Sequence, residues 1–307
     1  MKSGKVLVGL LLAGFLGAQT LQIEGPVSGF IFDESQRALR PIVGLPGAAY
    51  LGDAVVSELA WASTAPDGQR ALVLKDGALF SVSGLKGPEP TWVPVAGVRI
   101  APERAAWAED GSVALIYNSA SGTVQRVRGF NDLPLADDPI PLGDASALAV
   151  DRNGRIVAGT SDGVFLVDPS GPRPLLPGLR AISLAVAGTN LLVAAGNGEI
   201  WRIRDYAGEA SAELLAAVED PVGVALSQDQ KYLLVAGRAE RAVLIYELAA
   251  RAVAARLVAD AEPTTLARLG DADLWLVRTS SGPSDPLLVL KIRPEPAIWF
   301  VPAGKGE

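Results

Sequence analysis

Residues 191–203 read LLVAAGNGEIWRI, and this stretch decides the fold class. Two apolar runs flank Gly196, Asn197 and Gly198, and an Asn-Gly turn between such runs is a strong signal for a β-hairpin. Three other stretches have the same form: ALVLKDGALFSV from Ala71, RIVAGTSDGVFLVD from Arg155 and YLLVAGRAERAVLIYEL from Tyr232. The sequence therefore predicts a series of similar antiparallel hairpins.

The full repeating unit is larger than the hairpin. An Ala/Leu-rich run precedes each hairpin and a further run, often with Pro, follows it, so the unit is a four-stranded meander. The predicted first strands recur at spacings of 36 to 46 residues, aligned on Trp61, Trp107, Ala149, Ala185, Ala225 and Ala267. Such a repeat is typical of propeller blades. We predict an all-β fold, a β-propeller of four-stranded blades.

The position within the repeat decides how two features of the sequence are interpreted. Residues 246–257 have a helix-forming composition, but their position predicts the connection between a third and a fourth strand. Trp61 and Trp107 are aligned at the same point of two first strands, where packing between blades explains them better than an aromatic platform for a sugar.

The number of blades depends on an N-terminal hairpin, GFIFDESQRALRPIVG from Gly29. Residues 56–302 contain six complete units, and this hairpin resembles the outer half of a further one. We favour six blades, with the hairpin closing the ring against the C-terminal strand that carries Trp299 and Val301. An outer pair without inner strands would leave unpaired edges facing the channel. A ring with an incomplete seventh blade is the alternative.

The N-terminus has the layout of a secretory signal peptide. Lys2 and Lys5 precede an apolar run of 13 residues, Val6 to Ala18, and the chain turns polar at Gln19. That run is shorter than the roughly 18 to 20 residues that span a bilayer. We expect residues 1–18 to be a signal peptide and residues 19–307 a single propeller domain. The mature protein is then periplasmic or secreted, with no membrane span.

Composition excludes several classes of chemistry. The 307 residues include no Cys and no His, which removes disulfides, thiolate metal sites, histidine-ligated zinc and a Ser-His-Asp triad. A formal net charge of −7 without basic patches argues against nucleic-acid binding. The Gly-rich segments are hairpin turns, and no phosphate loop is present. The composition therefore favours a non-catalytic protein.

One stretch resembles a known repeat. Residues 229–248, DQKYLLVAGRAERAVLIYEL, resemble the repeat of bacterial YVTN-type and NHL-like propellers, in which a pair similar to Asp-Gly precedes a tyrosine-bearing strand and a second strand ends in an acidic residue. The stretch departs from that pattern at residues 236–238, where Gly237 alone replaces the usual Asn and Gly. The resemblance implies a propeller outside the cytoplasm that serves as an interaction scaffold. Some relatives are lactonases.

Loops that join second to third strands share one face of a propeller with loops that join neighbouring blades. Polar residues of these loops are our candidates for a binding face: Asp144, Arg180, Glu219, Asp220, Asp260, Glu262, Asn118 and Asn197. We expect an exported, non-catalytic scaffold, a monomer without cofactor, that binds a protein or glycan partner. The alternative is a cation-dependent, lactonase-like hydrolase in which carboxylates hold Ca²⁺ at the channel mouth. An envelope assembly component without a specific ligand is a third hypothesis.

Overall fold

The computed structural model describes residues 25–302, except residues 46, 169–170, 271–272 and 281–286. The predicted signal peptide, residues 1–18, lies outside the described residues. All regular elements in the described part are β-strands, as the hairpin pattern predicts. Within the same ranges, no helix is long and apolar enough to cross a membrane.

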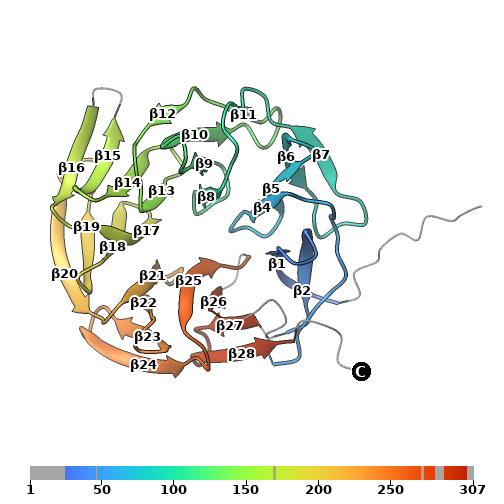
Figure 1. Cartoon of the computed structure of the whole chain (residues 1–307). Helices are drawn as coiled ribbons and strands as arrows, with labels where there is room; N and C mark the ends of the chain where they lie inside the picture. Colours follow the sequence, from blue (N-terminus) through green and yellow to red (C-terminus); the bar gives the residue numbers. More distant parts are fainter. Residues whose placement is uncertain (1–24, 46, 169–170, 271–272, 281–286, 303–307) are drawn as a thin grey trace, which may run out of the picture.

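Seven antiparallel sheets surround one axis, and each is a blade of a β-propeller (Figure 1). Blade one contains β1 (Val27–Asp33), β2 (Ala38–Val43) and β3 (Tyr50–Leu51). Blade two contains β4 (Trp61–Thr64), β5 (Arg70–Lys75), β6 (Ala78–Ser83) and β7 (Thr91–Pro94). Blade three contains β8 (Arg104–Trp107), β9 (Ala114–Asn118), β10 (Thr123–Arg128) and two short outer strands, β11 (Leu135–Ala136) and β12 (Ile140–Pro141).

The other four blades are regular four-stranded meanders. Blade four contains β13 (Ala147–Val150), β14 (Ile156–Thr160), β15 (Gly163–Asp168) and β16 (Gly171–Pro177). Blade five contains β17 (Ala181–Ala187), β18 (Asn190–Ala195), β19 (Glu199–Arg204) and β20 (Ser211–Ala217). Blade six contains β21 (Pro221–Leu226), β22 (Tyr232–Gly237), β23 (Ala242–Glu247) and β24 (Ala252–Val258). Blade seven contains β25 (Pro263–Arg268), β26 (Leu274–Thr279), β27 (Leu287–Lys291) and β28 (Ala297–Val301).

The favoured count of six blades is wrong, and the seven-bladed alternative is confirmed. The N-terminal hairpin is not the outer half of a blade, because β1 takes an innermost position: Phe30, Ile31 and Phe32 line the central channel together with residues of the other six innermost strands. The hairpin therefore fills the channel wall where an outer pair alone would have left a gap. The hairpin resembles an outer pair because the third strand of this blade has only two residues and no fourth strand follows in the same sheet.

Ring closure also differs from the expected strand pairing. The hairpin forms its own sheet and packs face to face on blade seven, so that the blue and red ends of the chain adjoin in Figure 1. Ile31, Ile42 and Leu51 share one buried cluster with Leu276 and Val301 and other residues of blade seven. A backbone hydrogen bond of 3.3 Å from Leu51 N to the oxygen of Pro302 also links the two blades. Apolar packing, more than a shared sheet, closes the ring.

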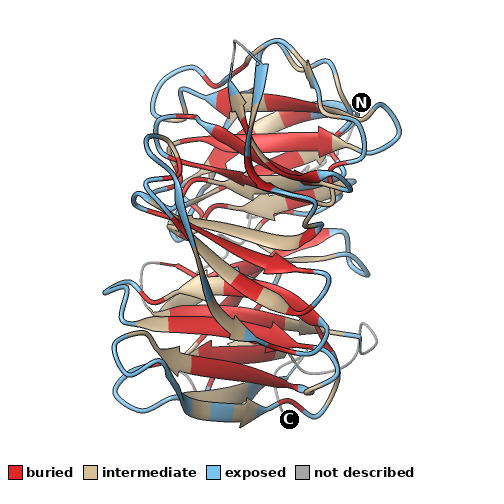
Figure 2. Cartoon of the chain, turned by 90° about the vertical axis from the view of Figure 1, so that its left-hand side faces the viewer, coloured by how far each residue is buried: buried red, intermediate tan, exposed pale blue. Residues whose placement is uncertain are grey.

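Burial follows position within the blade. Second strands lie between two neighbouring blades, so both of their faces are buried, and β18 and β22 are buried along nearly their whole length. Outermost strands are exposed, as in β7 and β24. Figure 2 shows the buried residues within the strands and the exposed residues in loops on both sides. Residues 246–257 form the end of β23, a turn and most of β24, which confirms the connection predicted there.

The two first-strand tryptophans are not equivalent. Trp61 is the first residue of β4, whereas Trp107 is the last residue of β8. The alignment of these two tryptophans at one position is therefore wrong by three residues. Their packing between blades is confirmed: both contact one apolar cluster shared by blades two and three. The Trp107 Nε1 donates to Ser63 Oγ at 3.0 Å, and the Trp61 Nε1 donates to the Glu103 carbonyl at 3.1 Å.

Candidate functional site

Antiparallel meanders give the ring two rims. The loops from first to second strands and from third to fourth strands form one, which we call the pocket rim; Asp151–Arg155 and Asp205–Ala207 belong to it. The loops from second to third strands and between blades form the other, the far rim. The eight binding-face candidates all lie on the far rim.

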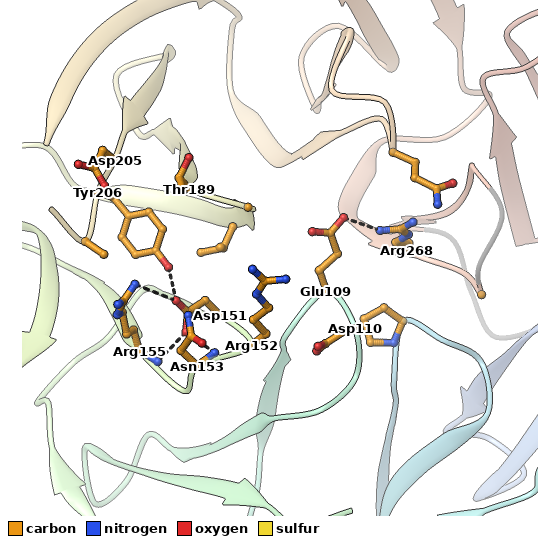
Figure 3. Close-up of a pocket in the computed structure, with 16 residues that line it drawn as sticks. Glu109, Asp110, Asp151, Arg152, Asn153, Arg155, Thr189, Asp205, Tyr206 and Arg268 are labelled. Atoms are coloured by element: carbon orange, nitrogen blue, oxygen red, sulfur yellow. Dashed lines mark hydrogen bonds and ion pairs between the residues drawn. The ribbon is translucent and has the colours of Figure 1, made fainter. Parts of the chain in front are cut away.

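A cavity of about 440 Å³ opens on the pocket rim, and we call it the mouth pocket (Figure 3). Six blades supply its lining, mainly from loops and also from the ends of β17 and β25: Pro66, Glu109, Asp110, Asp151, Arg152, Asn153, Arg155, Val186, Gly188, Thr189, Asp205, Tyr206, Ala207, Gln228, Arg268 and Gly270. Tight turns at Gly111 and Gly154, both with positive φ, position several of these residues. A pocket of this size is typical of ligand sites.

Asp151 organises one side of the mouth pocket. Its Oδ1 accepts the backbone N–H groups of Asn153 at 2.9 Å and Arg155 at 2.8 Å, which folds the β13–β14 turn. Its Oδ2 accepts the Tyr206 hydroxyl at 2.8 Å and lies 3.6 Å from Arg155 Nη1. Burial, and then the hydrogen bond to Asp151, raise the pKa of Tyr206. This carboxylate is buried and fully paired, so its role is to hold two loops together.

An ion pair crosses the mouth on the other side. Arg268 Nη1 lies 3.0 Å from Glu109 Oε1. Glu109 follows β8 in blade three and Arg268 ends β25 in blade seven, and these blades are not neighbours in the ring. The pair therefore spans part of the channel entrance (Figure 3). The Arg268 Nε is buried without a hydrogen bond to any described residue.

Arg152 differs from the other charged residues of the mouth pocket. It is exposed, and its guanidinium points into the space between the Asp151–Tyr206 pair and Glu109 in Figure 3. Among the described residues, its side chain makes no hydrogen bond or ion pair. A free guanidinium inside a cavity offers several donors to an anionic or polar group.

The mouth pocket continues into the central channel, a second cavity of about 430 Å³. Both cavities share Pro66, Glu109, Val186 and Arg268. Apolar side chains of the channel wall include Phe32, Leu148, Leu184, Leu226 and Leu266, which are half-buried. The innermost strands are also sheet edges, so their backbone polar groups face the channel. Pocket and channel together form one continuous funnel, with polar and apolar surface in both parts.

The structure distributes the eight sequence candidates around the far rim without gathering them at one point. Asp220 lies 3.3 Å from Arg238, so its charge is paired. Asn118 donates 3.0 Å hydrogen bonds to the Ala101 carbonyl and to Glu103, and Asn197 accepts the N–H of Glu199 at 3.1 Å. The remaining candidates are exposed loop residues: Asp144, Arg180, Glu219, Asp260 and Glu262. In the described part of the chain, no three acidic residues lie close enough to hold a metal ion.

Sequence reasoning missed the pocket rim because its residues look like turn formers. The segment Asp151-Arg152-Asn153-Gly154 has the same turn-forming residue types as the other turns after first strands. One signal was available: at the position of Arg152, the turns of blades two, three and six carry Pro66, Glu109 and Gln228, so the cation stands out.

Comparison with known proteins supports the fold class but shows no family. No family model matches the chain, and no curated protein matches its sequence. A functionally unknown protein from Desulfotomaculum acetoxidans has a similar structure, with a TM-score of 0.61 and 14% identity over 89% of this chain and 99% of that one. Hydrazine synthase from Kuenenia stuttgartiensis matches with a TM-score of 0.45 and 14% identity, over 77% of this chain and 96% of that one. The first likeness agrees with the β-propeller class.

Proposed function

We propose that this chain is an exported, non-catalytic β-propeller of the YVTN/NHL-like kind that acts as a binding scaffold for a protein or glycan partner. The observation that carries the proposal is the preformed mouth pocket. Its loops are held by the Asp151–Tyr206 and Glu109–Arg268 pairs, while Arg152 has no partner among the described residues. Rigid loops with unused donors are suited to binding, because little order is lost when a partner docks.

Export is supported by the basic and apolar segments before Gln19. The far rim, with its eight candidates, is a second surface on which the partner can dock. The two surfaces lie on opposite sides of the ring, so one experiment can separate them.

Site-specific photo-crosslinking tests the proposal. The photo-reactive residue benzoylphenylalanine replaces Thr189 on the pocket rim, Asn197 on the far rim, or Val253 on the exposed outer strand β24 as the matched control. Cells of the native host are irradiated, and the adducts are identified by mass spectrometry.

We expect one defined protein or glycan adduct from Thr189 and none from Val253. An adduct from Asn197 alone supports the scaffold function and moves its surface to the far rim. Absence of adducts from both rims, with the three proteins equally abundant and folded, contradicts the scaffold function.

A further inference from the structure

We propose that the mouth pocket binds a neutral sugar ring, the pyranose at the end of a glycan chain. The inference rests on the proposed scaffold function and names the class of partner that the scaffold recognises. It follows from the balance of charges in the lining, from the unused hydrogen-bonding groups there, and from their arrangement around the mouth.

The charges of the mouth pocket nearly cancel. Four acids and three arginines line it. The ion pairs of Arg155 and Arg268 each occupy one of the acids, so that Arg152 remains with Asp110 and Asp205. A strongly anionic ligand would lie beside these two carboxylates, and a cationic ligand would lie beside the guanidinium. The lining therefore favours a ligand without net charge.

The two remaining acids cap turns and keep unused acceptor capacity. Asp110 Oδ1 accepts the N–H of Ser112 at 3.0 Å and its hydroxyl at 2.6 Å, and Asp205 Oδ2 accepts the N–H of Glu209 at 3.0 Å. Among the described residues, Asp110 Oδ2 and Asp205 Oδ1 make no hydrogen bond. Hydroxyl groups donate hydrogen bonds without carrying a charge, so a neutral ligand can satisfy these oxygens through its hydroxyls.

Side chains with unused donors line the same pocket. Asn153, Thr189 and Gln228 are exposed there, and within the described ranges none of their side chains makes a hydrogen bond. The guanidinium of Arg152 adds further free donors. Each hydroxyl of a ligand both donates and accepts, so it can use an acid and a donor of this lining together. A polyhydroxylated ligand therefore suits the pocket better than a group that only donates or only accepts.

The unused groups come from equivalent turns of successive blades. The turns after the first strands of blades three to six supply Asp110, Asn153, Thr189 and Gln228 in that order. Figure 3 shows Asn153 and Thr189 on one side of the mouth and Asp110 on the other. Such an arrangement suits a ligand with hydrogen-bonding groups around its perimeter. The hydroxyls of a pyranose radiate from a compact ring, whereas an extended peptide carries its polar groups along a line.

The apolar part of the lining suits the C–H faces of a sugar ring. Pro66, Val186 and Ala207 are half-buried members of the lining. These side chains are small, so together they can cover one face of a ring but not a long apolar chain. The cavity volume of about 440 Å³ suits a small ligand.

Binding of the mature protein to an array of immobilised probes tests the inference. The neutral probes are trisaccharides of glucose, mannose, galactose and N-acetylglucosamine. Trisaccharides of galacturonate and of glucosamine are the anionic and cationic controls. Short neutral peptides on the same array represent a protein partner. Calorimetric titration then measures the affinity for each probe that is bound.

Two variant pairs locate the sugar. Arg152→Gln removes the free guanidinium from the mouth pocket, and Arg180→Gln removes an exposed arginine from the far rim as the matched control. Gln228→Ala removes an amide from the mouth pocket. Gln36→Ala removes an exposed amide from the β1–β2 turn, which lies on the same rim outside the pocket lining. Melting temperatures confirm that each variant folds.

We expect at least one neutral trisaccharide to bind about tenfold or more tightly than either charged trisaccharide, because each charged form meets a like charge in the lining. Arg152→Gln and Gln228→Ala should each weaken that binding about threefold to tenfold, the effect of one lost hydrogen bond. Both control variants should bind like the parent.

Three results overturn the inference. One is binding of a charged trisaccharide at least as tightly as every neutral one. Another is an affinity for the neutral trisaccharide that is unchanged in both Arg152→Gln and Gln228→Ala, which would put the sugar outside the mouth pocket. The third is no binding of any neutral trisaccharide, whether or not a peptide binds.

Failure of this inference and failure of the scaffold function give different results. A protein adduct from Thr189 in the crosslinking experiment, together with no binding of trisaccharides, removes the sugar and leaves the scaffold function intact. Absence of adducts from both rims removes the scaffold function itself.

Discussion

Asp151 illustrates how single residues shape the pocket rim. Tyr206 is fully buried and its hydroxyl donates to this carboxylate, so Tyr206→Phe leaves Asp151 with one acceptor site unfilled. We expect the variant to lower the free energy of unfolding by about 1 to 2 kcal/mol, measured by urea denaturation at pH 8. Tyr232→Phe, which alters a half-buried tyrosine of β22, is the control. Equal stability of Tyr206→Phe and the parent would contradict the role assigned to the hydroxyl.

The same tyrosine predicts a response to alkaline pH. The pKa of Tyr206 is raised above its ordinary value of 10.0 in the folded state, chiefly by burial. The folded protein then retains a proton that the unfolded chain releases, so this stability is complete below about pH 10 and is lost as the pH rises further. We expect the free energy of unfolding to fall less between pH 8 and pH 11 in Tyr206→Phe than in the parent. Parallel curves would show that this residue does not contribute.

Gly223 tests how closely the innermost strands approach. A Cβ built on Gly223 would lie 2.7 Å from the Leu266 Cβ and 2.8 Å from the Leu266 backbone nitrogen in the next blade. Gly223→Ala should therefore cost about 1 to 3 kcal/mol of stability by overpacking, seen as a lower melting temperature. Gly196→Ala is the control, because its Cβ meets only ordinary contacts from 3.6 Å. If both variants melt at the same temperature, the close approach is not real.

At the scale of elements, the hairpin of β1 and β2 closes the ring through its buried face. Ile42 is completely buried in the cluster that joins blades one and seven. We expect Ile42→Ala to cost about 2 to 5 kcal/mol, by loss of apolar contacts and creation of a cavity. Leu45→Ala, two residues beyond β2 and 66% exposed, should cost less than about 0.5 kcal/mol. Thermal unfolding of both variants checks the prediction. The prediction fails if Ile42→Ala and Leu45→Ala have the same melting temperature.

The strands and turns were more predictable from the sequence than the number of blades. Gly77, Gly163 and Gly198 adopt positive φ in hairpin turns, as the turn pairs at these positions indicate. All six residues used to align the first strands do lie on innermost strands. Blade one could not be counted by the repeat, because β3 is two residues long and the chain then returns to pair Val56 with Leu39 as an isolated bridge. Periodicity detects complete units, whereas tertiary packing defines incomplete ones.

The site was less predictable than the fold for a geometric reason. Arg152 and Arg268 are more than a hundred residues apart in the sequence, and only closure of the ring brings them to one mouth. The Glu109–Arg268 pair likewise joins two blades that are not neighbours. Local patterns describe each turn correctly but do not indicate which turns line a common cavity.

For the whole molecule, the signal peptide remains a prediction with a direct test. We expect exported protein to begin near Gln19, because the basic and apolar segments end there, and to elute as a monomer. N-terminal sequencing of protein from the periplasm or medium, with light scattering on the same sample, measures both. Exported protein that still begins at Met1 would show that the segment is a retained anchor.

The central claim is that the preformed mouth pocket makes this ring a binding scaffold. Photo-crosslinking from Thr189 on the pocket rim tests this claim most directly, with Val253 on the outer strand β24 as the control. The account predicts one defined protein or glycan adduct from Thr189 and none from Val253. Absence of adducts from both Thr189 and Asn197, with all three proteins equally abundant and folded, would contradict it.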